Sequence, residues 1–582
     1  MLYFLYSLSL LADVELLPVE VKGLKELNTF SFSDQVSIGE EELQNHPIGL
    51  ISSDLEKIPG VIASQNGGPG GRISFFIRGT ESRHVSFILD GLKINDTSNT
   101  DRQFDSSFFT SPFLKEITLS KGPQAVLYGS DAMGGLIELK TRKGERAPET
   151  RLNISGGSYG TISSSLSNDW KTTKHNGSIT YSTFHTDGLS RLNKKRFDAK
   201  EQDATDITQA LSSSEHRWGN KTQTDLLAGF LRGKSEQDGL SNDNSHDYSR
   251  NDQYLLQQKT NLEFSKDQAI SLRSGLNRHQ RLNNSLVSHK DFFNGDLYQN
   301  EFLHRIKNER IDLLSGVSSE HERAKANELN RSFDLHSLFL QSALKVEMLK
   351  FHLGGRIDRH SKYGEFKTGS IGISAGELSF QYSEGYKAPS LYQLYGPDSF
   401  GSPVGNANLI PETNHSLELM WKKSTDQFET SVTAFQNRLS NLFTYIFGQG
   451  YINQQRFIAE GVELNGKIKD NFYSISMNLT HQNFREEESP VLRRPYNSAS
   501  GTLSYFPSET IEVNFLGRWY SSRKDVTSKL NGFEVFELGM RKKWSQDEIS
   551  IQLKNIFDRE YEEVYGFSVL GRSVFTGYEH RF

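Results

Sequence analysis

From about residue 150 onward, apolar and polar residues alternate one by one in segments separated by short polar turns. The clearest segments are SISMNLT (474–480), IEVNFLGRW (511–519) and EISIQLK (548–554). Because side chains alternate across a β-strand, this period of two puts the apolar residues on one face and the polar residues on the other. Each segment therefore predicts a strand with one apolar and one polar face.

Strands of this kind continue through residues 146–582, which is unusually long for a soluble sandwich. A transmembrane β-barrel fits better, because closure pairs every backbone group inside the lipid while the polar faces line the lumen. A hairpin repeat of roughly 40 residues gives about 20 to 22 strands. We therefore expect an all-β membrane protein with an antiparallel barrel of about 22 strands, and with Trp519, Tyr520, Trp544 and Tyr578 as interfacial aromatics.

Residues 31–145 have a different pattern, with short strands and many glycines. Asp54–Ile58 is predicted to be a helix that ends at Pro59-Gly60, and Asp90-Gly91 is typical of a type I′ hairpin turn. The runs 125–128 and 136–141 look like short β-strands. Since a barrel of this size is either open or plugged, we expect an N-terminal α+β plug domain inside the lumen. The polar stretches 187–222 and 235–252 are expected to be external loops.

Composition narrows the function classes. The formal net charge is −6, from 66 basic and 72 acidic residues, which argues against a nucleic-acid partner. Cysteine is absent, so disulfides and thiolate metal sites are excluded. The apolar run MLYFLYSLSLLA (1–12) has the length of a signal-peptide core and is too short to span a bilayer as a helix. A signal peptide is the preferred interpretation, with an incomplete start or a buried N-terminal strand as alternatives.

Three motifs that resemble enzyme signatures lack their essential parts. Gly129 and Gly134 have P-loop spacing, but the Lys and Ser/Thr positions that should follow are Gly135 and Leu136. Residues 156–160 match G-x-S-x-G, yet a strand-like run follows where the motif needs a helix. No histidines have the spacing of a catalytic zinc site. The chain is therefore not expected to be an enzyme.

Longer segments resemble a known family. The segments 58–80, 87–96 and 116–141 are similar to the plug of TonB-dependent outer-membrane receptors, and 382–396 with 553–572 are similar to their barrels. Within the family, the likeness is greater to the cobalamin receptors than to the siderophore receptors. The resemblance implies a Gram-negative outer-membrane importer that works with TonB and its inner-membrane energising complex.

The resemblance also assigns site residues. A TonB box is expected in the linker 13–30, at Leu17, Pro18, Val19, Glu20 and Val21, where an extended segment can add a strand to a partner's sheet; an ordinary first strand is the alternative. The residues expected to contact substrate at the plug apices are Asn66, Gly67, Gly68, Gly70, Gly71, Arg72, Asn95, Thr97, Ser98 and Asn99.

No resident cofactor is expected, but calcium is possible because cobalamin receptors order their external loops around it. The loop carboxylates that could take part are Asp187, Asp198, Asp203, Asp206, Asp238 and Asp243. Calcium needs six to eight oxygens, and these residues do not form the tight cluster of the family site. Solvated loop carboxylates are therefore the preferred interpretation.

The expected substrate is cobalamin or a related corrinoid. A large, nearly neutral ligand edged with amides wants backbone, Asn, Gln or Ser partners, whereas an anionic iron chelate favours clusters of Arg or Lys. The presumed apices offer mostly the first kind of group. A ferric siderophore or haem receptor of the same architecture is the alternative. A plain porin would lack the plug and the TonB box.

Overall fold

The computed structural model describes residues 34–44, 46–144, 148–238, 247–285, 289–326, 328–398, 402–486 and 490–582. The predicted signal peptide (1–12), the TonB box at Leu17–Val21 and the loop residue Asp243 lie outside these ranges.

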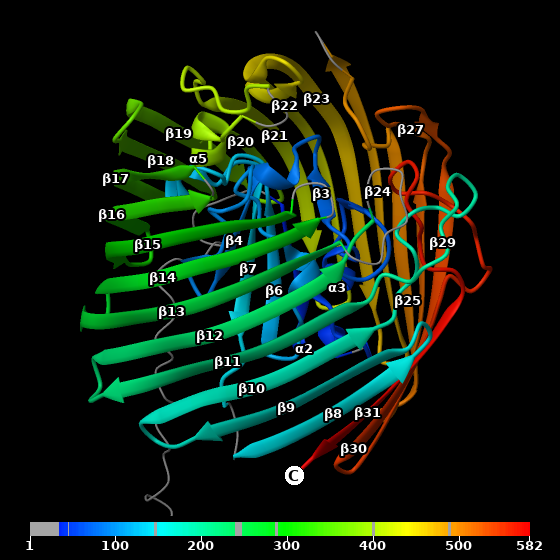
Figure 1. Cartoon of the computed structure of the whole chain (residues 1–582). Coiled ribbons are helices and arrows are strands. Elements are labelled where there is room, and N and C mark those ends of the chain that lie inside the picture. The colour runs from blue at the N-terminus through cyan, green and yellow to red at the C-terminus, as the bar shows by residue number, and fades with distance from the viewer. Residues whose placement is uncertain are drawn as a thin grey trace, which may run out of the picture.

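Twenty-two antiparallel strands form one closed barrel, which β31 completes by pairing with β8 (Figure 1). This confirms the fold class. The strands are β8 (Glu149–Gly157), β9 (Thr161–Lys171), β10 (His175–Thr186), β11 (Thr205–Trp218), β12 (Thr222–Glu236), β13 (Tyr248–Ser265), β14 (Gln268–Ser285), β15 (His289–Lys307), β16 (Ile311–Ala326), β17 (Leu329–Val346), β18 (Leu349–His360), β19 (Gly364–Ala375), β20 (Leu378–Lys387), β21 (Glu412–Ser424), β22 (Phe428–Ile446), β23 (Gly450–Lys469), β24 (Tyr473–Glu486), β25 (Asn497–Ser508), β26 (Ile511–Tyr520), β29 (Phe533–Trp544), β30 (Asp547–Lys554) and β31 (Ser573–Arg581).

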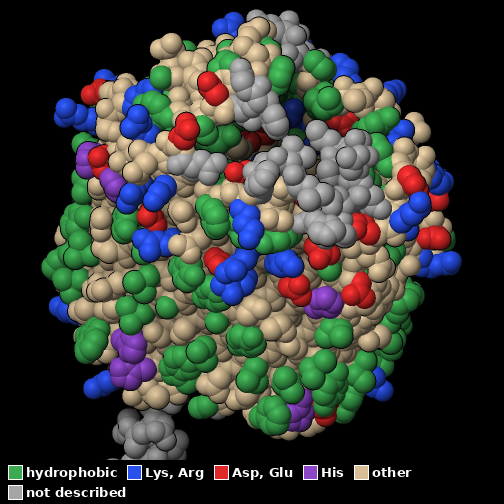
Figure 2. Space-filling view, viewed as in Figure 1, with side chains coloured by type: hydrophobic (Ala, Val, Ile, Leu, Met, Phe, Trp, Pro, Cys, Tyr) green, Lys and Arg blue, Asp and Glu red, His purple; other side chains and the backbone are tan. Residues whose placement is uncertain are grey.

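The alternation along each strand matches the two faces of the wall. On β24, Met477 and Leu479 are 46% and 41% exposed, while Asn478 between them is 3% exposed and faces the lumen. Apolar side chains accordingly gather over the lower part of the outer surface and charged ones over the upper part (Figure 2). Such a surface is what a transmembrane barrel presents to lipid.

Three of the four expected interfacial aromatics face outward. Trp519, Trp544 and Tyr578 are 42%, 39% and 40% exposed. The prediction for Tyr520 is wrong, because its ring is 7% exposed and packs in the lumen with Ile62, Phe76, Phe533 and Val535. The reason is the period of two: Tyr520 directly follows outward-facing Trp519 and must point inward.

A small α+β domain fills the lumen (Figure 1). Its five-stranded sheet has the order β1-β6-β7-β4-β5, and β2 and β3 form a separate hairpin. The elements are β1 (Gln35–Gly39), α2 (Glu40–Leu43), α3 (Ile51–Leu55), β2 (Val61–Gln65), β3 (Ile73–Ile77), η1 (Ser82–His84), β4 (Val85–Leu89), β5 (Leu92–Lys93), η2 (Ser106–Phe108), β6 (Leu114–Lys121), α4 (Ala125–Tyr128) and β7 (Gly135–Thr141). The expected plug is confirmed.

Two local predictions within the plug are corrected. The helix expected over 54–58 is α3, which runs from Ile51 to Leu55 and ends before Pro59. The run 125–128, expected to be a strand, is the single helical turn α4, which ends at Gly129 with φ +70°. Tertiary packing overrides local preference there, since all four residues of α4 are buried against the barrel wall.

The expected hairpin turn is present between β4 and β5. Asp90 and Gly91 have φ values of +48° and +96°, as a type I′ turn requires at both central positions. Asp90 also caps the end of β7, because its carboxylate accepts hydrogen bonds from the Thr141 amide (3.0 Å) and hydroxyl (2.5 Å).

The external loops are shorter than expected. Residues 205–218 of the predicted loop 187–222 form β11, so the loop itself is 187–204. Within 235–252, β12 ends at Glu236 and β13 begins at Tyr248. Small external elements include α5 (Leu391–Tyr395), β27 (Arg523–Lys524) and β28 (Lys529–Leu530). Among the described residues, no helix is long and apolar enough to cross a membrane.

Candidate substrate site and plug contacts

The first plug apex, residues 66–72, is a tight turn between β2 and β3. Gly67 and Gly70 have φ values of +81° and +83°, and the Asn66 amide donates to the Arg72 carbonyl at 3.0 Å. A Cβ on Gly70 would lie 2.1 Å from the Thr205 hydroxyl oxygen on β11. Glycine therefore permits the turn and its close approach to the barrel wall.

External loops cover most of this apex. A Cβ on Gly67 would lie 2.9 Å from the Arg191 side chain, and one on Gly68 would lie 3.2 Å from Leu189, so loop 187–204 rests on both glycines. The Arg191 guanidinium also donates to the Asn66 carbonyl at 3.1 Å. Arg72 is different, because 46% of its side chain is exposed. Arg72 is thus the part of this apex that is open to a ligand.

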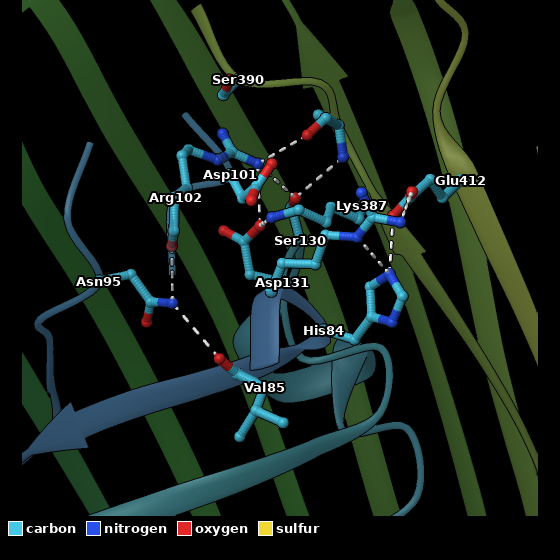
Figure 3. Close-up of polar contacts among 12 residues, drawn as sticks. His84, Val85, Asn95, Asp101, Arg102, Ser130, Asp131, Lys387, Ser390 and Glu412 are labelled. Carbon is cyan, nitrogen blue, oxygen red and sulfur yellow. Dashed lines mark hydrogen bonds and ion pairs between the residues drawn. The ribbon is translucent and has the colours of Figure 1, made fainter. Parts of the chain in front are cut away.

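The second apex, residues 95–99, is buried. Asn95 is 2% exposed, its side-chain oxygen accepts from the Phe87 amide (2.9 Å), and its side-chain nitrogen donates to the Arg102 carbonyl (3.0 Å) (Figure 3). The Ser98 hydroxyl donates to Asp96 at 2.6 Å. Thr97 packs against Gly295 of β15, and Asn99 accepts from the Asp101 amide at 3.2 Å. Substrate contact at these four residues stays a prediction, and they brace the loop in this structure.

The outer surface also carries four tyrosines that sequence reasoning missed. We call Tyr392, Tyr395, Tyr445 and Tyr451 the aromatic rim. Tyr445 is 42% exposed and its ring centroid lies 5.4 Å from that of Tyr451. Tyr451 in turn lies within electrostatic reach of Arg72 and Asp101.

Helix α5 positions two of the rim residues. Ser390 and Gln393 form a capping box at its N-terminus, which satisfies backbone amides there. The Ser390 hydroxyl also donates to the Thr100 carbonyl (2.5 Å), and the Gln393 side-chain NH2 group donates to the Asp101 carboxylate (3.1 Å). The helix is therefore bound to the segment that directly follows the second apex. A short segment with S-x-x-Q and two tyrosines, 390–395, was the available sequence signal.

Cations accompany the rim. The Arg331 guanidinium lies 5.5 Å from the Tyr395 ring centroid, and the Lys362 ammonium lies 4.8 Å from it. Arg281 stacks over Phe293 at 4.8 Å and donates to the Ser98 carbonyl at 2.9 Å. Aromatic faces and cations together favour a ligand that is both anionic and unsaturated.

Deeper in the lumen, buried ion pairs join the plug to the wall. Arg78, at the end of β3, contacts Glu418 of β21 and Glu463 of β23, each at 2.9 Å. Lys121 of β6 contacts the same Glu463 at 3.0 Å and Asp34 at 2.9 Å. All five side chains are at most 5% exposed. Removing one partner of such a buried pair typically costs about 3–5 kcal/mol.

A second group lies closer to the outer face. The Asp131 carboxylate, just after α4, contacts Arg102 at 2.9 Å and Lys387 of β20 at 2.5 Å (Figure 3). Arg102 also contacts Glu322 of β16 at 3.0 Å. Burial opposes ionisation of Asp131, but Arg102 and Lys387 hold its pKa below the usual range. The pairs thus link plug and barrel through ionised groups.

A third contact involves His84, at the end of η1. Its Nε2 lies 2.9 Å from Glu412 of β21, and Arg83 contacts the same carboxylate at 3.1 Å (Figure 3). Burial lowers the pKa of His84, and Glu412 opposes this shift only in part. We call the contacts of Arg78, Lys121, Arg102, Arg83 and His84 with the wall the lock.

Two of the six candidate calcium ligands come together in the loops. Asp203 and Asp238 join Glu201, which sequence reasoning missed, and one carboxylate oxygen from each lies within 4.8 Å of the others. Asp203 is 2% exposed, and burial raises its pKa to about 7, with Asp238 adding to the shift. The Asp203 carboxylate also accepts from the Arg191 amide at 2.8 Å. Three carboxylates fit a cation only in part, because calcium takes six to eight oxygens.

Three other candidates, all within the described residues, do not join this cluster. Asp206 and Asp187 flank His185 at 2.8 Å and 3.3 Å. Asp198 is exposed and pairs with Lys200 at 2.9 Å. For these three residues, the interpretation as solvated carboxylates stays a prediction.

With this geometry established, comparison with known proteins identifies the family. Residues 149–556 match the TonB-dependent receptor-like β-barrel, and residues 28–136 match the TonB-dependent receptor plug domain. The chain is a TonB-dependent receptor. It is therefore an outer-membrane transporter of Gram-negative bacteria and not an enzyme, as the sequence predicted.

Several solved structures of similar fold are siderophore receptors or iron transporters. The siderophore receptor PirA of Acinetobacter baumannii is 16% identical with a TM-score of 0.82, over 94% of this chain and 98% of that one. The ferric enterobactin receptor PfeA of Pseudomonas aeruginosa is also 16% identical, with a TM-score of 0.78 over 94% and 98%. The iron transporter FrpB of Neisseria meningitidis is 13% identical, with a TM-score of 0.78 over 94% and 99%. At this identity the likeness shows the fold alone, and none of these three is a cobalamin receptor.

Proposed function

We propose that this TonB-dependent receptor imports an anionic iron chelate of the ferric siderophore class, which binds between Arg72 and the aromatic rim. The observation that carries the proposal is the chemistry of that surface: the exposed guanidinium of Arg72 within electrostatic reach of Tyr451, the other tyrosines of the aromatic rim, and Arg331 and Lys362 beside Tyr395. Catecholate chelates of iron are compact, anionic and aromatic, so they suit such groups.

The corrinoid expectation loses its physical support. It rested on amides and hydroxyls at the two apices, but Asn95 and Asn99 use their side chains inside the plug, and loop 187–204 covers Gly67 and Gly68. The structural neighbours PirA, PfeA and FrpB are siderophore receptors or iron transporters, which supports the siderophore class.

Equilibrium binding to the purified protein tests this assignment. A panel of ferric catecholate and hydroxamate complexes, haem and cyanocobalamin is titrated while tyrosine and tryptophan fluorescence is followed. We expect at least one ferric siderophore to bind, and Arg72→Ala to weaken it about tenfold or more, the cost of one charge-assisted contact. Lys174→Ala, in a periplasmic turn, is the matched control. Tight binding of cyanocobalamin or haem alone would contradict the proposal.

Energy coupling is proposed to enter through the TonB box at Leu17–Val21. Val19→Pro removes a backbone donor and fixes the local backbone, so it disrupts strand addition to TonB. We expect whole cells carrying this variant to bind the siderophore normally and to lose its active uptake. Loss of binding together with uptake would show that the segment is structural.

A further inference from the structure

Arg72, the open cation of the first apex, is held by two side chains of one short plug segment, residues 101–103. Its Nη2 lies 3.7 Å from the Asp101 carboxylate. The Gln103 amide, oriented with its oxygen toward Arg72, accepts from Nε at 2.8 Å and from Nη2 at 3.0 Å. The guanidinium is therefore fixed in direction while 46% of the side chain stays exposed. Asp101 and Gln103 are thus positioning residues for this cation.

Arg102, between these two residues, is anchored in the lock (Figure 3). Its side chain is buried and contacts Asp131 and Glu322. The backbone at Arg102 has a φ of +53°, in the left-handed region that a residue other than glycine rarely adopts. Such a conformation persists only where the surrounding contacts hold it. The segment is therefore held firmly, and Asp101 cannot swing freely away from Arg72.

Helix α5 fixes the Asp101 carboxylate from another direction. The side-chain NH2 group of Gln393, which is buried, donates to this carboxylate at 3.1 Å. The Asp101 side chain remains 25% exposed, on the same surface as Arg72. Tyr451 of the aromatic rim lies within electrostatic reach of both residues. A carboxylate in a fixed position is therefore part of the proposed substrate site.

This carboxylate sets Arg72 apart from the other cations of the site. Neither Arg331 nor Lys362 is paired with a carboxylate among the described residues. An anion that approaches Arg72, in contrast, also approaches the negative charge of Asp101. Charges a few ångströms apart near a protein surface interact strongly enough to change a binding constant severalfold. Asp101 therefore works against the attraction that the three cations provide.

We propose that Asp101 is a specificity-determining residue of the substrate site, whose carboxylate opposes the binding of an anionic chelate at Arg72. The inference rests on the proposed function, because it requires an anionic substrate. The hydrogen bond from Gln393 does not by itself require a charge at this position, since the oxygen of a neutral amide could accept it. Asp101 thereby limits how strongly the site favours the more highly charged chelates.

This role suits a protein that must release what it binds. In the empty receptor, Asp101 and Gln103 hold Arg72. A bound chelate takes over part of that contact, and the two residues restore it when the chelate leaves, so release does not leave the guanidinium without a partner. Throughout, Arg102 and Gln393 keep the Asp101 carboxylate close to the ligand. The expected result is an affinity lower than the cations alone would give.

Asp101→Asn tests the proposal, because the amide keeps the shape of the side chain and removes its charge. An anionic ferric tris(catecholate) is titrated against the purified full-length protein, at about 10 mM and at about 1 M salt. We expect the variant to bind about fivefold more tightly than the wild type at low salt, and the gain to shrink at high salt because salt screens the repulsion. Asp101→Glu, which keeps the charge, should remain close to the wild type.

Asp198→Asn is the matched control, because it removes the same charge from an exposed position in loop 187–204. The heat-modifiable migration of the barrel on gels shows that each variant is folded. Unchanged or weaker binding by Asp101→Asn, or an equal gain in Asp198→Asn, would overturn the role of Asp101. If the wild type still binds the chelate in that case, the proposed function stands. A wild type that binds no ferric chelate would overturn both.

Discussion

The plug meets the barrel in two contrasting ways. On the lock side, buried charges of the plug contact Glu322, Lys387, Glu412, Glu418 and Glu463 on β16 to β23. On the other side, along β23 to β30, a cavity of about 330 Å³ separates plug and wall at the periplasmic end. We call this the cavity side.

The contrast shows that the contacts that fix the orientation of the plug need not be those that hold it most strongly. A buried ion pair adds little net stability but penalises any arrangement that leaves one charge alone, so the lock specifies how the plug sits. On the cavity side, ion pairs join Glu56 with Arg518 at 2.7 Å and Glu81 with Arg494 at 2.9 Å, and Arg518 keeps a second carboxylate, Glu537, at 3.4 Å. Separation of the plug from the wall on this side therefore leaves fewer buried charges without a partner. We therefore expect the plug to loosen first along the cavity side.

The largest effect is expected from Glu463→Ala on the lock side. The change leaves Arg78 and Lys121 buried with one partner fewer each, which should cost about 3–5 kcal/mol of plug docking. The measurement is the denaturant dependence of protease cleavage within the plug, with the heat-modifiable barrel as an internal reference. A loss of less than about 1 kcal/mol in the free energy of plug unfolding would show that the two sides do not differ in this way.

Glu56→Ala is the matched change on the cavity side. Its carboxylate is 16% exposed, and Arg518 retains Glu537 after the change. We expect a loss of about 1 kcal/mol, in the range of partly exposed ion pairs. A cost as large as that of Glu463→Ala would show that both sides hold the plug equally.

The pH dependence of plug stability should also differ between the two sides. Away from the lock, the responsible group is Asp54 on α3. Asp54 is fully buried beside His46, and burial raises its pKa to about 8. Because the folded state binds a proton that the unfolded state releases, stability falls as the pH rises between about 4 and 8, by about 1.4 kcal/mol per unit at most. We expect Asp54→Asn to flatten this part of the unfolding profile between pH 6 and 8. An unchanged slope would mean that the carboxylate is not the responsible group.

On the lock side, His84 is expected to make the stability of the plug depend on pH in the opposite direction. Burial lowers its pKa, so the unfolded chain binds the extra proton and the lock should weaken as the pH falls below about 6.5. Protease cleavage of the plug, measured at pH 5.5 and 7.5, shows whether its stability falls toward acid pH, as His84 predicts, or toward alkaline pH, as Asp54 predicts. His84→Gln should remove the acid-side loss while Asp54→Asn leaves it in place.

The smallest effect is expected from calcium at Glu201, Asp203 and Asp238. With three carboxylates, we expect a dissociation constant of about 10⁻⁴ to 10⁻³ M. Titration calorimetry of the wild type and Asp203→Asn measures it, with Asp198→Asn as the matched control. Calcium that raises siderophore affinity severalfold, lost in Asp203→Asn, would mean that this loop region belongs to the binding site.

The barrel was predictable because its signal is local. Alternation places Ile475 outward and Asn478 inward without any knowledge of neighbouring strands. Helix α4 was missed for the opposite reason: its residues favour a strand locally, and only burial against distant strands of the wall makes one helical turn the better choice.

The lock was not predictable, because its partners are far apart in the chain. Arg78 and Glu463 are separated by 385 positions, and His84 and Glu412 by 328. A lone Arg after the apolar run ISFFI was a visible anomaly, but no pattern in the sequence indicates which carboxylate it meets. The burial of Asn95 was not predictable either. A polar loop residue is expected to be exposed, and only the fold shows that its side chain is hydrogen-bonded inside the plug.

The edge strand β1 has a mechanical consequence. It pairs with β6 alone, antiparallel from Gln35 opposite Ser120 to Gly39 opposite Glu116, and Asp34 at its start is tied to Lys121. A tension that arrives at Asp34 from the N-terminal side and pulls toward the periplasm loads this ladder at one end. The ion pair would give way first and the backbone bonds would then open one after another, as in a zipper, at a lower force than shearing them together would need.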